Sequence, residues 1–219
     1  MNGMRLKNLI SIVVAVFFCT ITHVSSIAQA SDRPIDAIQA TVDAVLNTIK
    51  DKALSDPARK EERRKKISAL LRERFNFQEM AKRSLAKHWK ERTPEEKKQF
   101  VDIFSDLLEA SYIGKIEAYT DEKVRYDKEV IKKKDKYAVV STSVVTKDVD
   151  IPIDYKVINK GDGWFVYDVV IEGVSFISTY RSQYNKVIIK ESFAGLIDKM
   201  KKKLEEVNSG EGNKNTAES

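Results

Sequence analysis

Apolar residues recur at helical spacing in three segments of the first half of the chain, residues 34–49, 57–71 and 94–119. A proline begins each segment, where a helix tolerates it because the first N–H groups have no partner within the helix. Thr93 and Glu96 have the spacing of a capping box ahead of the third segment. A shorter apolar stretch over residues 75–89 predicts a turn into a short helix. The pattern therefore predicts helices over these segments, with the longest over 94–119.

After Thr120 the apolar period changes from 3.6 to 2, which indicates strands. The four predicted strands are residues 124–131, 137–145, 149–157 and 164–171. Charged or glycine-rich turns separate most of them, so consecutive strands are expected to pair as antiparallel hairpins. Pro152 cannot donate to a strand ladder, and the third strand is therefore expected at a sheet edge or with a bulge at this residue.

The fourth strand is apolar on both faces apart from Asp168. Strict alternation places Trp164, Val166 and Val170 on one face and Phe165, Tyr167, Val169 and Ile171 on the other. Such a strand is predicted to be central and covered on both sides. Gly173 breaks it, and Ser175 has the position of an N-cap for the helix that follows. A last amphipathic helix is predicted over residues 193–204.

Helices, then a strand meander, then closing helices indicate an α+β fold. We predict a curved antiparallel sheet of about four strands, packed against N- and C-terminal helices. Residues 31–207 are expected to form a single domain. Residues 208–219 lack large apolar side chains and are predicted to be a disordered tail.

The first 30 residues have the three-part layout of a secretory signal. Arg5 and Lys7 precede a 16-residue apolar run, and an Ala-Gln-Ala sequence ends at Ala30. The run is shorter than the roughly 20 apolar residues that a transmembrane helix needs. We therefore expect a signal peptide over residues 1–30 that is cleaved on secretion. A membrane anchor and a lipoprotein attached through Cys19 are the alternatives.

Cleavage would leave 189 of the 219 residues and would remove Cys19, the only cysteine. A mature chain without cysteine has no disulfide, no thiol nucleophile and no cysteine metal ligand. Residues 1–30 hold two of the 39 basic residues and none of the 33 acidic ones, so the net charge falls from +6 to +4. This mild excess suits contact with anionic surfaces, whereas nucleic-acid binders are usually more basic.

The sequence contains few residues in the arrangements that catalysis or metal binding requires. The mature chain has one histidine, His88, and residues 173–177 lack the second glycine of a nucleophile elbow. Asp148, Asp150 and Asp154 lie on a predicted strand without the loop that wraps calcium. The sequence has no phosphate-binding glycine loop and no zinc motif. We therefore predict no enzymatic activity, no cofactor and no metal.

The predicted sheet has more apolar surface than one covering layer of helices can bury. The strands over residues 137–145 and 164–171 are apolar on both faces. The second face either packs against more protein in a three-layer core or encloses an apolar ligand such as a lipid. The pattern alone leaves both interpretations open.

Two groups of residues match one family in order. The first group comprises residues 75–81, Trp89, residues 93–96 and the apolar positions that follow as far as Tyr112. The second group comprises residues 164–175 and 180–184. Together they resemble MlaC, the periplasmic phospholipid carriers of the maintenance-of-lipid-asymmetry system, also called toluene-tolerance proteins. The resemblance covers about residues 33–207. Lys87 departs from it, since the family usually has glycine before the aromatic residue.

The resemblance implies a periplasmic carrier, expected to be a monomer, whose acyl chains lie in a pocket between sheet and helices. It would shuttle phospholipid between an outer-membrane lipoprotein complex and an inner-membrane ABC transporter complex. A hopanoid-associated carrier of the same family and a secreted interaction module that binds no lipid are the alternatives. Arg181 is expected at the pocket mouth or paired with Asp168 or Glu172. The candidate lipid-binding residues are Phe104, Leu108, Tyr112, Val139, Ile153, Tyr155, Val169, Ile171, Val174 and Phe176.

Overall fold

A computed structural model of the protein describes residues 33–119 and 123–209. The predicted signal peptide and residues 210–219 of the predicted tail lie outside the described residues. The α-helices are α1 (Pro34–Lys50), α2 (Lys60–Arg74), α3 (Phe77–Leu85), α4 (Pro94–Glu117) and α5 (Phe176–Asn208). Short 3-10 helices are η1 (Lys52–Leu54), η2 (Pro57–Arg59) and η3 (Ala86–Glu91). The strands are β1 (Lys123–Lys132), β2 (Tyr137–Val145), β3 (Asp150–Asn159), β4 (Trp164–Ile171) and β5 (Val174–Ser175).

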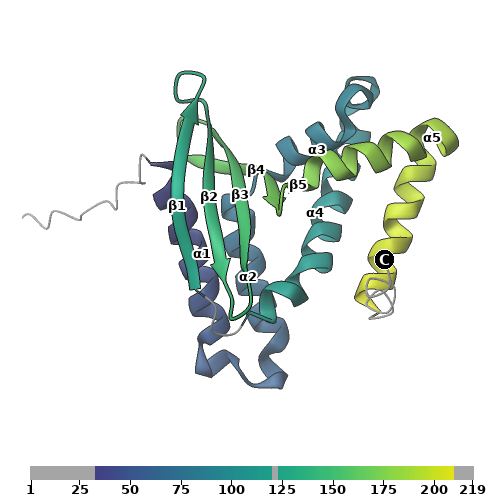
Figure 1. Cartoon of the computed structure of the whole chain (residues 1–219). Helices are drawn as coiled ribbons and strands as arrows, with labels where there is room; N and C mark the ends of the chain where they lie inside the picture. Colours follow the sequence, from purple (N-terminus) through teal and green to yellow (C-terminus); the bar gives the residue numbers. More distant parts are fainter. Residues whose placement is uncertain (1–32, 120–122, 210–219) are drawn as a thin grey trace, which may run out of the picture.

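Local hydrogen bonds fix the starts of two helices at the predicted residues. Thr93 Oγ1 accepts from the Glu96 N–H at 3.2 Å, and Glu96 Oε2 accepts from the Thr93 N–H at 2.9 Å, so the capping box is complete. Ser175 Oγ accepts from the Ser178 N–H at 3.1 Å and caps α5. The α5 helix is interrupted at Ser192, whose backbone has φ 80° and ψ 172°. Its C-terminal half therefore turns away from its first half (Figure 1).

The sheet follows the predicted meander, in the order β1-β2-β3-β4-β5, with every neighbouring pair antiparallel. Helices α1 and α2 lie along one side of it, and α3, α4 and α5 stand beyond its β4–β5 edge (Figure 1). The expected α+β fold is confirmed. Within the described ranges, no helix combines the length and the apolar character needed to cross a membrane.

The prediction that β4 is a central strand is confirmed only in part, since β4 lies between β3 and the two-residue strand β5. It pairs along its length with β3 alone, and β5 adds only two residues on its other side. The rest of that edge is covered by the segment between α2 and α3, where the Asn76 N–H donates to the Val166 carbonyl at 2.8 Å. Val166 is nevertheless fully buried. A strand can thus be apolar on both faces because helices and loops cover it, without full strands on both sides.

The prediction for Pro152 is wrong. β3 lies between β2 and β4, and its register with β4 shifts between Lys156 and Val157, not at Pro152. The proline is tolerated because pairing with β4 begins one residue later, at Ile153. Its carbonyl is used, since it accepts from the Glu172 N–H at 3.0 Å.

The bulge changes which side chains of β4 share a face. Val157 is opposite Val166, whereas Lys156 is opposite Asp168, so Tyr167 is the extra residue. Trp164 and Val166 consequently pack in the same buried cluster as Val169, and Ile171 packs against that cluster. The alternation predicted from the sequence placed these residues on two faces, and the extra residue explains the error.

The buried side chains form two main clusters. One lies among α3, α4 and α5 and includes the stacked rings of Phe100 and Phe104, with Tyr184 against them. The other joins α1 to the sheet and includes Ile38 and Val140. A smaller cluster, with Ile67 and Ile113, connects α1, α2 and α4. The long helix α4 therefore stands between the helical core and the sheet.

Candidate functional site

A cavity of about 540 Å³ lies between the sheet and the helices that face it. This volume falls within the range of about 300–1,000 Å³ that is typical of ligand pockets. The sheet contributes Val124, Val144, Ile153, Tyr155, Val166, Val169 and Ile171. Helix α1 contributes Ile38, Thr41, Val42, Val45, Leu46 and Ile49. Leu108, Tyr112, Ile116 and Tyr119 come from α4 and the turn after it, and Phe176 begins α5.

The α1 wall follows from the helical period of the sequence. Apolar residues at intervals of three and four positions form one stripe, and that stripe faces the cavity. The sheet wall follows from the period of two, after the β4 bulge brings Val166 and Val169 to the same side. The lining is apolar except for a few side chains, among them Arg74, Glu109 and Lys115. Such a cavity can exclude water from hydrocarbon.

Seven of the ten candidate residues line this cavity, namely Leu108, Tyr112, Ile153, Tyr155, Val169, Ile171 and Phe176. Phe104 does not, because it lies in the helical core with its ring against Tyr180 and Tyr184. Val139 is on the opposite face of β2 from the buried Ala138 and Val140. Val174 is 59% exposed and lies at the outer groove described below.

The sequence interpretation missed the α1 wall and Arg74. The α1 stripe was visible as an amphipathic pattern, but the pattern does not say which element the stripe faces. Arg74 Nε donates to Thr41 Oγ1 at 2.9 Å, and Nη1 donates to the Trp164 carbonyl at 2.6 Å. Burial lowers the pKa of the Arg74 guanidinium, which an arginine withstands without losing its charge. This residue therefore ties α2 to both α1 and β4 behind the cavity.

Tyr155 places a hydroxyl group among the apolar residues of the sheet wall. Burial raises the pKa of Tyr155 to about 12. The phenol is consequently neutral at physiological pH, and the wall carries no charge at this point.

A buried carboxylate fixes the corner where β4 passes through β5 into α5. Asp168 is 4% exposed and accepts from Lys156 Nζ at 2.9 Å, Ser175 Oγ at 2.7 Å and the Ile177 N–H at 3.1 Å. Arg181 does not pair with Asp168 or Glu172 as expected, and its Nε donates to the Arg83 carbonyl at 3.0 Å. The corner positions Phe176 on the cavity wall.

The polar residues weighed as catalytic or metal-binding candidates have structural contacts. His88 is buried, and its Nε2 lies 3.0 Å from Asn185 Oδ1. Asp150 pairs with Arg125 at 2.8 Å on the outer part of the sheet. Across the described part of the chain, no cluster of three or more His, Cys, Asp or Glu side chains is placed to hold a metal ion.

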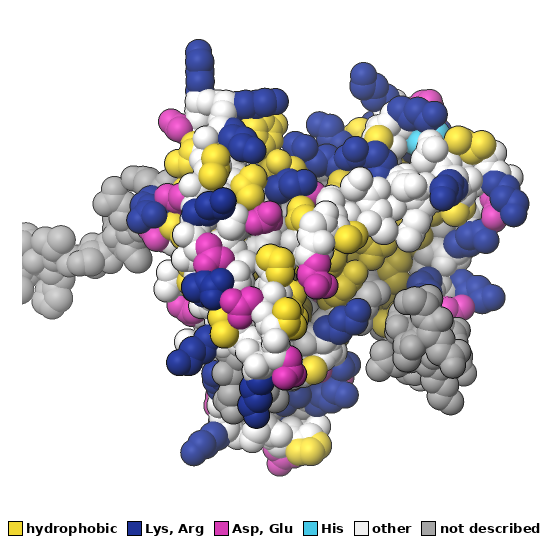
Figure 2. Space-filling model, viewed as in Figure 1, with side chains coloured by type: hydrophobic (Ala, Val, Ile, Leu, Met, Phe, Trp, Pro, Cys, Tyr) yellow, Lys and Arg dark blue, Asp and Glu magenta, His cyan; other side chains and the backbone are white. Residues whose placement is uncertain are grey.

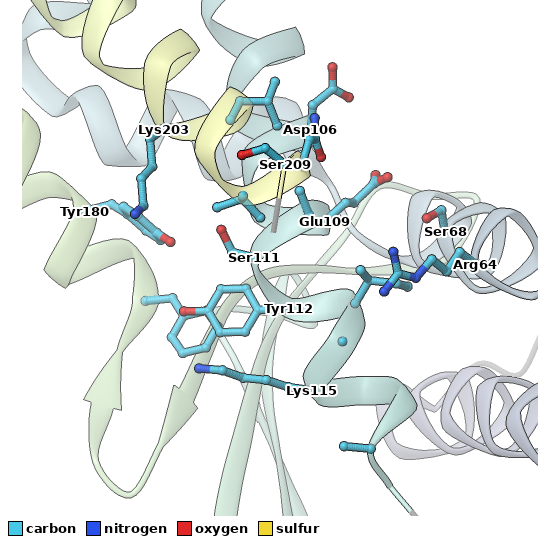
Figure 3. Close-up of a pocket in the computed structure, with 18 of the residues that line it drawn as sticks. Arg64, Ser68, Asp106, Glu109, Ser111, Tyr112, Lys115, Tyr180, Lys203 and Ser209 are labelled. Atoms are coloured by element: carbon cyan, nitrogen blue, oxygen red, sulfur yellow. The ribbon is translucent and has the colours of Figure 1, made fainter. Parts of the chain in front are cut away.

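A groove of about 1240 Å³ runs along the other side of α4. Its second wall is the C-terminal half of α5, including Lys203, Leu204 and Val207. Arg64 and Ser68 of α2 lie across α4 from Tyr180 and Lys203 (Figure 3). Within the part of the chain described, the groove and the apolar cavity are thus two hollows that flank the same helix.

Comparison with known proteins places the chain in a family. The MlaC protein family model matches residues 39–202. The chain is 23% identical over 207 residues to the intermembrane phospholipid transport system binding protein MlaC of Haemophilus influenzae, covering 91% of this chain and 94% of that protein. It is also similar to the phospholipid-binding protein from Ralstonia solanacearum, solved in complex with a phospholipid, with a TM-score of 0.70 and 27% identity. That match covers 79% of this chain and 97% of the solved chain.

The family match spans most of the chain and contains both groups of residues on which the sequence resemblance rests. The solved relative has the same fold over nearly its whole length. The chain therefore belongs to the MlaC family, as its sequence motifs predicted.

Proposed function

We propose that this protein carries phospholipid, with the acyl chains held in the cavity between the sheet, α1 and α4. The observation that carries the proposal is the cavity itself, about 540 Å³ with an almost wholly apolar lining. The phospholipid bound to the Ralstonia solanacearum relative and the transport system named for the Haemophilus influenzae relative support it. The carrier would shuttle between outer-membrane and inner-membrane complexes and so maintain the lipid asymmetry of the outer membrane.

The energetics allow both capture and release. Burying a methylene contributes about 0.8 kcal/mol, so about ten buried methylenes would contribute about 8 kcal/mol before other costs. That value corresponds to a dissociation constant of about 1 μM, and the ordering of the ligand weakens it further. Partial enclosure of the chains is therefore enough to keep a lipid in the carrier while leaving it transferable.

The mature protein is proposed to act in the periplasm after residues 1–30 are cleaved. Support comes from the sequence, where a basic start, an apolar run and an Ala-Gln-Ala site have the order of a secretory signal. The intact mass of the secreted protein tests this part, because a chain that retains residues 1–30 would contradict cleavage.

Organic extracts of the purified protein are expected to contain phospholipid, since the cavity would otherwise expose apolar walls to water. Mass spectrometry of the extracts identifies the lipid class and its amount per protein. Hopanoids in place of phospholipid would favour the alternative carrier. Extracts without lipid, from protein purified without detergent, would contradict the carrier proposal and favour an interaction module.

Reversing the charge of the β1–β2 hairpin is expected to slow lipid transfer to the partner complexes. Lys133, Lys134 and Asp135 are exposed and have left-handed backbones, with φ of 53°, 52° and 60°. Lys133 Nζ and Lys136 Nζ lie 5.6 Å and 5.9 Å from the centroid of the Tyr137 ring. A carrier must leave each partner, so salt-sensitive polar contacts suit its docking.

The variant Lys132→Glu/Lys133→Glu/Lys134→Glu is expected to reduce the transfer rate about tenfold at low ionic strength and less at high ionic strength. Its lipid content should equal that of the wild type. The control Lys186→Glu/Lys190→Glu reverses two exposed lysines of α5, away from the hairpin. Transfer that responds neither to salt nor to the hairpin reversal would exclude docking through this hairpin.

A further inference from the structure

The cavity and the groove meet at four residues. Glu109, Tyr112, Lys115 and Phe176 line both hollows. The rings of Tyr112 and Phe176 are stacked, with centroids 4.8 Å apart and an interplanar angle of 24°. This aromatic pair therefore forms the partition between the two hollows. In Figure 3, Tyr112 and Lys115 lie one above the other on the α4 wall of the groove.

Lys115 is the cation at this partition, in the last turn of α4. Its side chain is exposed, and its Nζ lies 5.2 Å from the centroid of the Tyr112 ring. Among residues 33–119 and 123–209 it forms no ion pair. Glu109, the acid that lines both hollows, is paired with Arg72, whose Nε lies 2.7 Å from Glu109 Oε1. The partition therefore presents a positive charge to whatever occupies it.

Of the other three cations that line the groove, Arg64 and Lys203 are paired with acids, and Lys60 is exposed at the start of α2. Arg64 Nε lies 2.9 Å from Glu117 Oε2, and Lys203 Nζ lies 3.2 Å from Glu206 Oε2. Figure 2 shows hydrophobic side chains gathered in the hollow between the sheet and the C-terminal half of α5, with Lys and Arg side chains around it. The cavity side of Lys115 is thus largely apolar, whereas its groove side holds both basic and acidic side chains.

An amphiphile whose chains fill the cavity must place its first polar group where the apolar lining ends. Moving a phosphate from bulk water to this position costs less free energy if a cation lies within contact distance. A lipid that ends in a hydroxyl group would gain little from the same cation. The position of Lys115 therefore distinguishes lipids by the charge next to their acyl chains.

We propose that the cavity opens into the groove past the Tyr112–Phe176 pair and that Lys115 contacts the phosphate of the bound lipid at this mouth. Lys115 is then the residue by which the carrier takes phosphate-bearing lipids in preference to neutral lipids with the same acyl chains. The inference rests on the proposed function, since it assumes that lipid chains occupy the cavity.

The test offers both kinds of lipid to the delipidated protein at once. Vesicles contain equal amounts of dioleoyl phosphatidylglycerol and dioleoylglycerol. The rest of the vesicle is a neutral matrix of ether lipids, free of phosphatidylcholine, chosen because extracts of the protein do not contain them. The protein is then re-isolated, and its bound lipid is identified by mass spectrometry. Wild type is expected to retain more phosphatidylglycerol than dioleoylglycerol. Lys115→Glu is expected to lower the ratio of the two about three- to tenfold, and Lys115→Gln to lower it less.

The matched control is Lys186→Glu, an equal charge change at an exposed lysine of α5 away from both hollows. It should leave the ratio at the wild-type value, because both lipids come from the same vesicle and any change in vesicle binding affects them alike. Circular dichroism confirms that each variant is folded. An unchanged ratio in Lys115→Glu would overturn the proposal while leaving the carrier function intact. Wild type that takes up neither lipid would instead contradict the carrier function.

Discussion

Val169→Trp is expected to remove most of the lipid that co-purifies with the protein while leaving it folded. Val169 is 8% exposed and lines the cavity from β4. An indole directed into the cavity would occupy space that the proposed acyl chains need. Displacing two methylenes, at about 0.8 kcal/mol each, already weakens binding about tenfold. Lipid per protein, measured in organic extracts, and the free energy of unfolding in urea together check this expectation.

The matched control is Val139→Trp, at a half-buried position on the other face of the sheet. Its lipid content should stay at the wild-type level, because the added ring does not enter the cavity. If the cavity were a solid core, Val169→Trp would instead overpack it and cost about 1–3 kcal/mol. A destabilised Val169→Trp protein together with lipid-free wild type would show that no lipid pocket exists.

Asp168→Asn is expected to lower the free energy of unfolding by about 2–4 kcal/mol. The carboxylate is buried and accepts hydrogen bonds from Lys156, Ser175 and the Ile177 N–H. An amide has one acceptor oxygen, so at least one buried donor would be left without a partner. Lys156, which is 35% exposed, would lose its ion pair but could be solvated.

Urea unfolding measures this loss, and Asp162→Asn is the control. Asp162 is exposed in the β3–β4 turn, and its substitution should change stability by less than about 0.5 kcal/mol. An equally small effect for Asp168→Asn would mean that the corner does not depend on the carboxylate.

Elements that depend on local interactions were predictable from the sequence. The start of α4 is one case, since Thr93, Pro94 and Glu96 provide the cap without help from the rest of the fold. The strand boundaries of β2 and β4 are another, because period-two apolar runs end at clear turns. The order of the strands followed from short hairpin connections.

Features decided by pairing between distant segments were not predictable. The faces of β4 were misassigned because its bulge arises only in register with β3. Phe104 was assigned to the pocket because it lies on the same predicted apolar side of α4 as Leu108 and Tyr112, and only the packed structure shows that its ring faces α5. The α1 stripe was visible, yet its position over the sheet depends on tertiary packing. Asp168 was taken as an interruption of the strand, since its donors lie in β3 and at the β5–α5 junction and are brought to it only by the fold.

The covered side of β4 has a consequence for how copies of this protein behave in solution. Unpaired strand edges are templates on which other chains add strands and aggregate. In the described part of the chain, one edge of the sheet is closed by β5 and the Asn76 hydrogen bond to Val166. The opposite edge, β1, is rich in exposed charge and carries a bulge between Tyr126 and Lys128. Both edges are therefore protected, so the sheet offers little to edge-to-edge association.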